Sequence, residues 1–174
     1  VMMALLEIES THIRARADQV KDLTVFVLRD DCDTPELEEI ARNGISERFE
    51  ILTEFVLSPQ QRARVMSQTR GGNWIERRRK DPVEPTRVLV CKNALTPGPL
   101  PYPVSAKKLK SKYPLLENTD VLIKRVIREV VNKAAQGEHK RVVIHATDNP
   151  TEAAETLSAI YAKQYDAEIA KLAM

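Results

Sequence analysis

Four short runs rich in β-branched and aromatic residues alternate with helix-forming segments, and this order limits the folds that the chain can adopt. The runs lie at residues 23–28, 49–57, 86–91 and 141–144, and their composition is typical of buried strands. Capping residues and apolar spacing predict helices at residues 33–45, 58–69, 116–135 and from Pro150 past Tyr165. The expected order is therefore strand then helix, four times over.

This order favours one α/β (α+β) sheet domain. With four strands, the economical fold has helices packed on one face of one sheet. The ferredoxin-like split βαβ arrangement fits best and predicts a four-stranded antiparallel sheet, with a doubly wound sheet as the main alternative. We expect an N-terminal extension at 1–20 and the domain at 21–174. The domain carries a proline-rich insertion at about 93–115 and ends in a long C-terminal helix.

The composition excludes several classes of protein. A chain of 174 residues can bury a core, and its net charge of +2 imposes no global preference for a partner. No apolar run is long enough to span a bilayer, so no membrane association is expected, and the N-terminus lacks the basic lead of a signal peptide. Cys32 and Cys91 make neither a disulfide framework nor a metal motif, and they fit a reducing, cytoplasmic location. No histidine lies at metal-ligand spacing from a cysteine, so no metal site is predicted.

His145 is the candidate for chemistry because it lies between two predicted elements. It follows the apolar run 141–144 and precedes a helix that Asp148 or Asn149 can cap and that Pro150 opens. Backbone N–H groups and the helix dipole favour anions at such a helix start. A phosphate could lie there beside a nucleophilic imidazole nitrogen. The alternative is a purely structural histidine.

Three local patterns resemble the nucleoside diphosphate kinase family over roughly residues 21–162. Leu-Arg-Asp-Asp at 28–31 stands where the family has Ile-Lys-Pro-Asp, and Leu-Ser-Pro-Gln-Gln-Arg-Ala at 57–63 resembles its Ser-led helix cap. Arg-Val-Val-Ile-His-Ala-Thr-Asp at 141–148 resembles the family's signature of Arg, Asn, two apolar residues, the active His, Gly or Ala, Ser and Asp. The family fold is ferredoxin-like, which agrees with the order of elements.

The resemblance implies nucleotide binding and kinase chemistry through a phosphohistidine. The family's histidine takes a phosphoryl group from a nucleoside triphosphate such as ATP, with Mg²⁺ accompanying the nucleotide, and passes it to a nucleoside diphosphate. His145 matches that histidine, and Arg29 takes the place of the phosphate-neutralising lysine. Arg141 and Asp148 match the arginine and aspartate of the signature. Trp74 lies near the position of the aromatic residue that stacks on the base.

The chain also departs from the family pattern. Val142 replaces the signature asparagine, and Thr156 stands where a carboxylate orients the family's histidine, with Glu152 or Glu155 as substitutes. The family's loop with Pro-Gly-Thr and Arg-Gly-Asp-Phe strings has no counterpart, which removes its phosphate contacts and its contribution to a hexamer. Candidate replacement cations are Lys107, Lys108, Lys110, Lys112, Lys124 and Arg125.

Two functions from other classes are also compatible with the sequence. Basic tracts at 62–80 and 107–112, with Trp74, Tyr102 and Tyr113 among or beside them, suit RNA binding through phosphate contacts and stacking. Alternatively, the chain is a catalytically degenerate structural or regulatory subunit that contacts a protein partner through its terminal helices. The apolar stripe of the last helix, which extends to Leu172, favours this second alternative.

Overall fold

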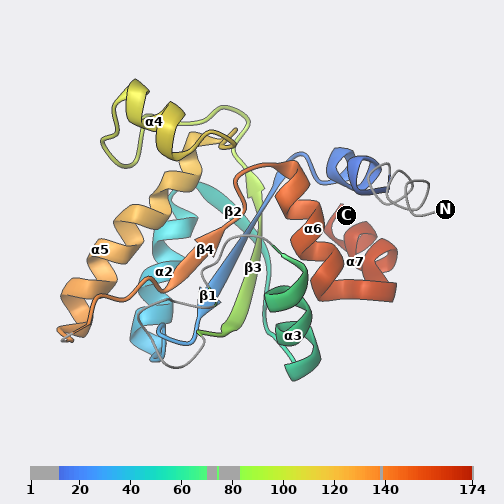
Figure 1. Cartoon of the computed structure of the whole chain (residues 1–174), viewed down its shortest axis with the longest axis horizontal. Helices are drawn as coiled ribbons and strands as arrows, with labels where there is room; N and C mark the ends of the chain where they lie inside the picture. Colours follow the sequence, from blue (N-terminus) through green and yellow to red (C-terminus); the bar gives the residue numbers. More distant parts are fainter. Residues whose placement is uncertain (1–11, 70–73, 75–82, 138, 174) are drawn as a thin grey trace.

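The structure, a computed structural model, describes residues 12–69, 74, 83–137 and 139–173 (Figure 1). Its elements are β1 (Leu23–Arg29), α2 (Pro35–Ser46), β2 (Phe49–Val56), α3 (Pro59–Gln68), β3 (Pro85–Asn93), α4 (Ala106–Lys112), the 3₁₀ helix η1 (Thr119–Leu122), α5 (Ile123–Ala135), β4 (Ile144–Ala146), α6 (Pro150–Tyr161), the 3₁₀ helix η2 (Ala162–Gln164) and α7 (Tyr165–Leu172). Residues 12–19 are also helical. Over these ranges, no helix is both long and apolar enough to cross a membrane.

The four strands form one sheet in the order β2-β3-β1-β4. Every neighbouring pair is antiparallel. The long strands β1 and β3 lie at the centre, and short β4 pairs with β1 through only three residues, among them His145 opposite Val27. The predicted four-stranded antiparallel sheet of an α+β protein is confirmed, and the doubly wound alternative does not apply.

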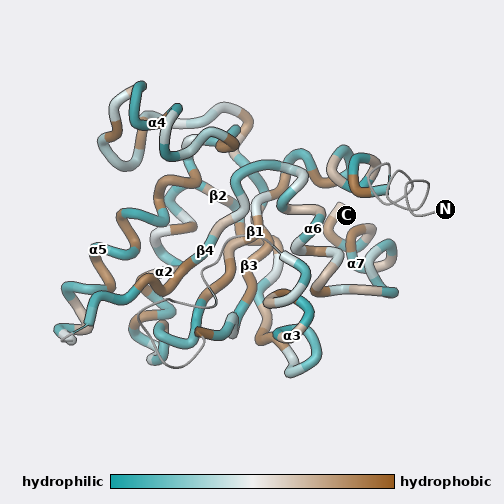
Figure 2. Tube along the Cα trace, viewed as in Figure 1, coloured by the Kyte–Doolittle hydropathy of each residue, from teal (hydrophilic) through white to brown (hydrophobic). Residues whose placement is uncertain are grey.

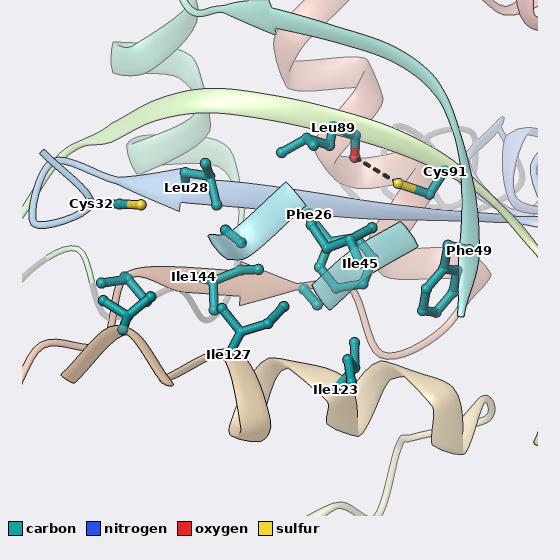
Figure 3. Packing of buried hydrophobic residues seen from close by; sticks show 14 of the residues in the cluster. Phe26, Leu28, Cys32, Ile45, Phe49, Leu89, Cys91, Ile123, Ile127 and Ile144 are labelled. Carbon is teal, nitrogen blue, oxygen red and sulfur yellow. Dashed lines mark hydrogen bonds between the residues drawn. The ribbon is translucent and has the colours of Figure 1, made fainter. Parts of the chain in front are cut away.

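Helices cover both faces of the sheet, whereas the sequence analysis predicted one covered face. We call the first side the α2–α5 layer, whose core includes Phe26, Leu28 and Leu89 (Figure 3). The opposite side, the α3–α6–α7 layer, has Val25 and Val27 in its core. Successive strand residues point to opposite faces, and the central strands each contain four consecutive apolar residues, 25–28 in β1 and 88–91 in β3, so both faces require a cover (Figure 2).

Part of the expected N-terminal extension belongs to the α3–α6–α7 layer. Ala17 and Val20 are buried in its core. Arg16 donates a hydrogen bond from Nη1 to Oγ of Ser158 on α6 at 2.8 Å. Residues 1–11 lie outside the described residues. The described end of the extension is therefore packed on the body of the domain.

Three of the four predicted helix starts, those of α2, α3 and α6, are confirmed by their caps. The Thr34 side chain caps α2, and Ser58 forms a capping box with Gln61 at the start of α3. Asn149 caps α6 by accepting a hydrogen bond from the backbone of Glu152, so of the two predicted candidates the cap is Asn149.

Two helices are shorter than predicted. The helix expected at 116–135 opens as a 3₁₀ turn at Thr119, and α5 begins only at Ile123. The long C-terminal helix is wrong as a single element, because α6 and α7 are separated by η2, where Ala162 has a φ of 50° that no continuous helix contains. The stripe expected to reach a partner packs inward, with Tyr165 in the α3–α6–α7 core and Leu172 against it.

The fourth strand begins at Ile144 instead of Arg141. Val143 has a φ of 56°, and the backbone N–H of Ile144 donates to the carbonyl of Val142 at 2.7 Å, which makes a γ-turn. Positive φ is rare for a β-branched residue. His145 therefore lies at the middle of β4 and not at the end of a strand.

Candidate functional site

His145 faces the α3–α6–α7 layer. Its neighbours in β4, Ile144 and Ala146, are buried in the core of the opposite layer. His145 is partly exposed, and its ring meets that of Trp74 edge to face, with centroids 5.9 Å apart and planes at 73°. No hydrogen bond joins the imidazole to any residue that the structure describes. The ring is therefore held by packing and retains its hydrogen-bonding capacity.

The environment of His145 keeps its imidazole neutral. Burial is the main cause, and the charges of Lys124, Arg128 and Arg29 add to it, so that the pKa of His145 falls to about 3. A cation close to the ring disfavours the imidazolium form for the same reason that it favours an anion there. At physiological pH the ring thus has one nitrogen with a free lone pair, in the positive field of three side chains.

Arg128 reaches this position around the open edge of β4. Its Nε donates to the carbonyl of Val142 at 3.1 Å, and its Nη2 donates to the carbonyl of Ile144 at 2.7 Å. Because β4 is the last strand of the sheet, these carbonyls have no neighbouring strand to pair with on that side. Arg128 closes the edge and brings a guanidinium near His145. Nothing in the sequence around Arg128 predicts this contact.

Lys124 is the second cation and is one of the replacement cations that the sequence offered. It is buried, with its Nζ 3.5 Å from Oδ1 of Asp148 and 5.7 Å from the ring centroid of Tyr113. Burial lowers the pKa of Lys124, and the carboxylate of Asp148 opposes this effect. Asp148, predicted to belong to the site, is thus the counter-ion of a site cation.

Arg29 is the third cation, at the end of β1. It is fully buried, and its Nη2 lies 3.5 Å from Oδ2 of Asp31. Its charge is one of those that lower the pKa of His145. The position predicted from the family's lysine is therefore electrostatically coupled to the histidine.

Arg141 is directed toward the loop between β1 and α2. Its Nη1 donates to the carbonyl of Asp31 at 2.8 Å and to Oδ1 of Asp33 at 2.7 Å. Its backbone N–H is bound by Asn132 of α5. None of the contacts described for Arg141 joins it to His145. Its observed role is to fasten this loop to the segment that leads into β4.

Trp74 packs against the ring of His145. It is 5% exposed, and its Nε1 is buried without a hydrogen-bond partner among the described residues. Its backbone carbonyl accepts a hydrogen bond from Val83 at 2.7 Å. Base stacking, which the resemblance implied, requires an exposed ring face, and Trp74 instead borders the imidazole.

Glu152, one of the two carboxylates offered as orienting groups, is engaged by the backbone. Oε2 of Glu152 accepts a hydrogen bond from the backbone N–H of Asp148 at 2.8 Å, and burial raises the pKa of Glu152. Thr156, at the family's carboxylate position, is buried in α6. The described segments contain no group of three or more His, Cys, Asp or Glu side chains that could hold a metal ion.

His145 lines none of three surface pockets that the described residues form. The pocket closest to it along the chain has a volume of about 230 Å³ and is lined by Thr147, Asp148 and Asn149 among others. Comparison of the chain with protein-family models, curated proteins and solved structures found no match. The chemistry of the site itself is the basis for assigning a function.

Proposed function

We propose that this chain is a nucleotide-binding domain of the nucleoside diphosphate kinase type, in which His145 accepts a phosphoryl group from a nucleoside triphosphate such as ATP. The main support is a partly exposed, neutral imidazole with Lys124, Arg128 and Arg29 close enough to lower its pKa. This combination suits a nucleophile that must approach a phosphate. Structural histidines are more often held by hydrogen bonds, which the described residues do not supply to this ring.

We also infer that the sheet is ferredoxin-like. Its strand order β2-β3-β1-β4 and its antiparallel pairing support this topology. In that topology, α2 and α5 are the two helices that share one face of the sheet, and they pack against each other here. Helices α3, α6 and α7 are then additions that cover the second face.

In this proposal, transfer proceeds in two balanced steps. The unprotonated ring nitrogen of His145 attacks the γ-phosphorus, an N–P bond forms, and the bond to the oxygen of the leaving nucleoside diphosphate breaks. A second nucleoside diphosphate reverses the step with its own terminal oxygen. Lys124, Arg128 and Arg29 offset the negative charge of the transferred group. With a pKa near 3, His145 needs no base to become a nucleophile at neutral pH.

Magnesium in this scheme belongs to the substrate. The charged groups that shift the pKa of His145 are all cations, and the described residues contain no carboxylate cluster suited to a protein-bound metal. Mg²⁺ then arrives on the phosphates of the nucleotide, as hard oxygen ligands favour. A cytoplasmic location, where nucleoside triphosphates are available, is part of the same proposal.

The test is incubation with γ-labelled ATP and Mg²⁺, followed by acid and alkali treatment of the labelled protein. We expect an acid-labile, alkali-stable label on the wild type, on His12→Ala and on His139→Ala, and none on His145→Ala. Trp74 is the only tryptophan of the chain and adjoins His145, so its fluorescence reports nucleotide binding independently. A label that persists in His145→Ala contradicts the proposal. Absence of both label and fluorescence change in the wild type leaves the structural-subunit alternative.

A further inference from the structure

The short helix α4 carries four lysines that no described acid neutralises. Lys107, Lys108, Lys110 and Lys112 are all exposed, and none of them forms an ion pair within the described ranges. The helix lies outside the two layers, beyond the N-terminal part of α5 (Figure 1). Its position and charge are not explained by packing of the core.

Tyr113 joins these lysines to cations of α5. Arg125 donates a hydrogen bond from Nη1 to the Tyr113 hydroxyl. The Nζ atoms of Lys112 and Lys124 each lie 5.7 Å from the centroid of its ring. Burial by itself raises the pKa of the phenol, but the hydrogen bond from Arg125 and the three charges reverse the effect and lower it. The positive potential is therefore continuous from α4 to α5.

Acidic side chains at the margin of this surface are already engaged. Glu129 accepts a hydrogen bond from the Tyr102 hydroxyl at 3.0 Å, and Asp120 is paired with Arg48 at 2.8 Å. The guanidinium of Arg125 lies 4.8 Å over the ring of Tyr102. Both tyrosine rings thus have cations of the same chain as neighbours, and the exposed charges of α4 favour phosphate contacts as the main binding chemistry.

We propose that the surface formed by the α4 lysines and Arg125 binds the phosphate backbone of a single-stranded nucleic acid without sequence preference. A run of phosphates matches cations spread over two helices better than one small anion does. The lysines of α4 occupy a wide arc of a short helix, at 3.6 residues per turn. A flexible strand can follow such a convex surface, whereas a rigid duplex reaches fewer of its charges. This activity is separate from chemistry at His145.

The experiment measures binding of fluorescein-labelled oligouridine by anisotropy over a salt series. In one variant Lys107, Lys108, Lys110 and Lys112 become Gln. A control variant with the same loss of charge replaces Lys133, Lys140, Lys163 and Lys171, which are exposed on other parts of the molecule. Each phosphate contact contributes about 0.7 to the slope of log K against log salt for single strands, so we expect the α4 variant to lose up to about 3 from that slope. The control variant should keep the wild-type slope.

Three outcomes overturn the proposal. They are no binding by the wild type at low salt, an equal loss in the control variant, and binding of anionic phospholipid vesicles in place of RNA. Thermal melts of both variants show whether the exposed substitutions leave the fold intact. His145→Ala should bind RNA as the wild type does, so failure of the phosphohistidine proposal and failure of this one are distinguishable.

Discussion

The two helical layers pack on the same sheet but contain different kinds of side chain. On the α2–α5 side, Phe26, Ile45, Ile127 and Ile144 form a closed apolar cluster (Figure 3). On the α3–α6–α7 side, the cluster borders His145 and contains Trp74, whose indole N–H is buried without a partner among the described residues. Unpaired buried donors lower stability by about 1 to 3 kcal/mol each. The first layer is therefore the more completely apolar of the two, although its helix α5 also carries Lys124 and Arg128, two of the cations that lower the pKa of His145.

In strand β4, neighbouring residues point to opposite faces of the sheet and so contact different layers. Ile144 and Ala146 enter the apolar core of the α2–α5 layer, and His145 faces the other side. A shift of register by one residue would exchange these faces. The γ-turn at Val143 sets the point where the ladder begins, so a locally unfavourable backbone conformation fixes the face of the histidine.

The largest expected effect is acid sensitivity that originates at His145. Its pKa of about 3 lies below the ordinary value of 6.5, so the unfolded chain binds this proton first. The contribution of His145 to stability is then constant above pH 6.5 and falls as the pH decreases toward 3, by roughly 4 kcal/mol. Urea unfolding followed by Trp74 fluorescence over this pH range measures the effect. His145→Gln should lose correspondingly less stability than the wild type, and parallel pH curves for the two proteins would contradict the inferred environment.

A cavity in the α2–α5 layer should reduce stability without changing the chemistry. Ile127 is fully buried on α5, and truncation to Ala removes apolar contacts and leaves a void, which costs about 3 kcal/mol. Chemical denaturation of Ile127→Ala measures this loss. Phosphohistidine formation per folded molecule should stay at the wild-type level below the melting transition. A specific loss of labelling in a folded protein would show that Lys124 and Arg128, which lie on the same helix, depend on this packing for their positions.

The elements that local sequence determines were predicted well. Caps at Thr34 and Ser58 depend on residues only three positions away, and the strand runs are visible as apolar segments. The covered second face was missed, although the unbroken apolar run 25–28 is typical of a strand buried on both sides.

The arrangement of the site depends on contacts between distant segments, which a single sequence does not specify. His145 was identified from its neighbours in the chain. Arg128 was not, because its partners are the carbonyls of Val142 and Ile144, and only the position of β4 at the sheet edge leaves these free for it. The break at Ala162 was missed for a related reason, since a helical pattern continues through it and only its positive φ ends the helix.

The close approach of α2 to α5 offers a smaller test within the α2–α5 layer. A Cβ added at Gly44 would lie 2.5 Å from Cγ1 of Ile127. Alanine is more favourable than glycine within a helix by about 1 kcal/mol, yet we expect Gly44→Ala to destabilise by about 2 kcal/mol because the buried Ile127 side chain must move away from the new methyl group. Urea denaturation of Gly44→Ala, Ile127→Ala and the double variant gives the free energies of unfolding for a double-mutant cycle. The double variant should be more stable than the sum of the single effects predicts, and strict additivity would argue against the contact.

The smallest effect compares one helix cap from each layer. Thr34 caps α2, and Asn149 caps α6 directly after the Asp148 that pairs with Lys124. Replacement of either cap by Ala should lower stability by about 1 kcal/mol, because each leaves a helix N–H without its side-chain acceptor.

The two cap variants should differ in function. Asn149→Ala loosens the helix start that holds Asp148 through Glu152, so Lys124 loses a fixed counter-ion and labelling of His145 slows. Thr34→Ala leaves these contacts unchanged and should label at the wild-type rate. Matched melting curves with initial labelling rates decide between the outcomes. Equal labelling of the two variants would mean that the start of α6 supports the fold alone and that Lys124 does not depend on it to act on the phosphate.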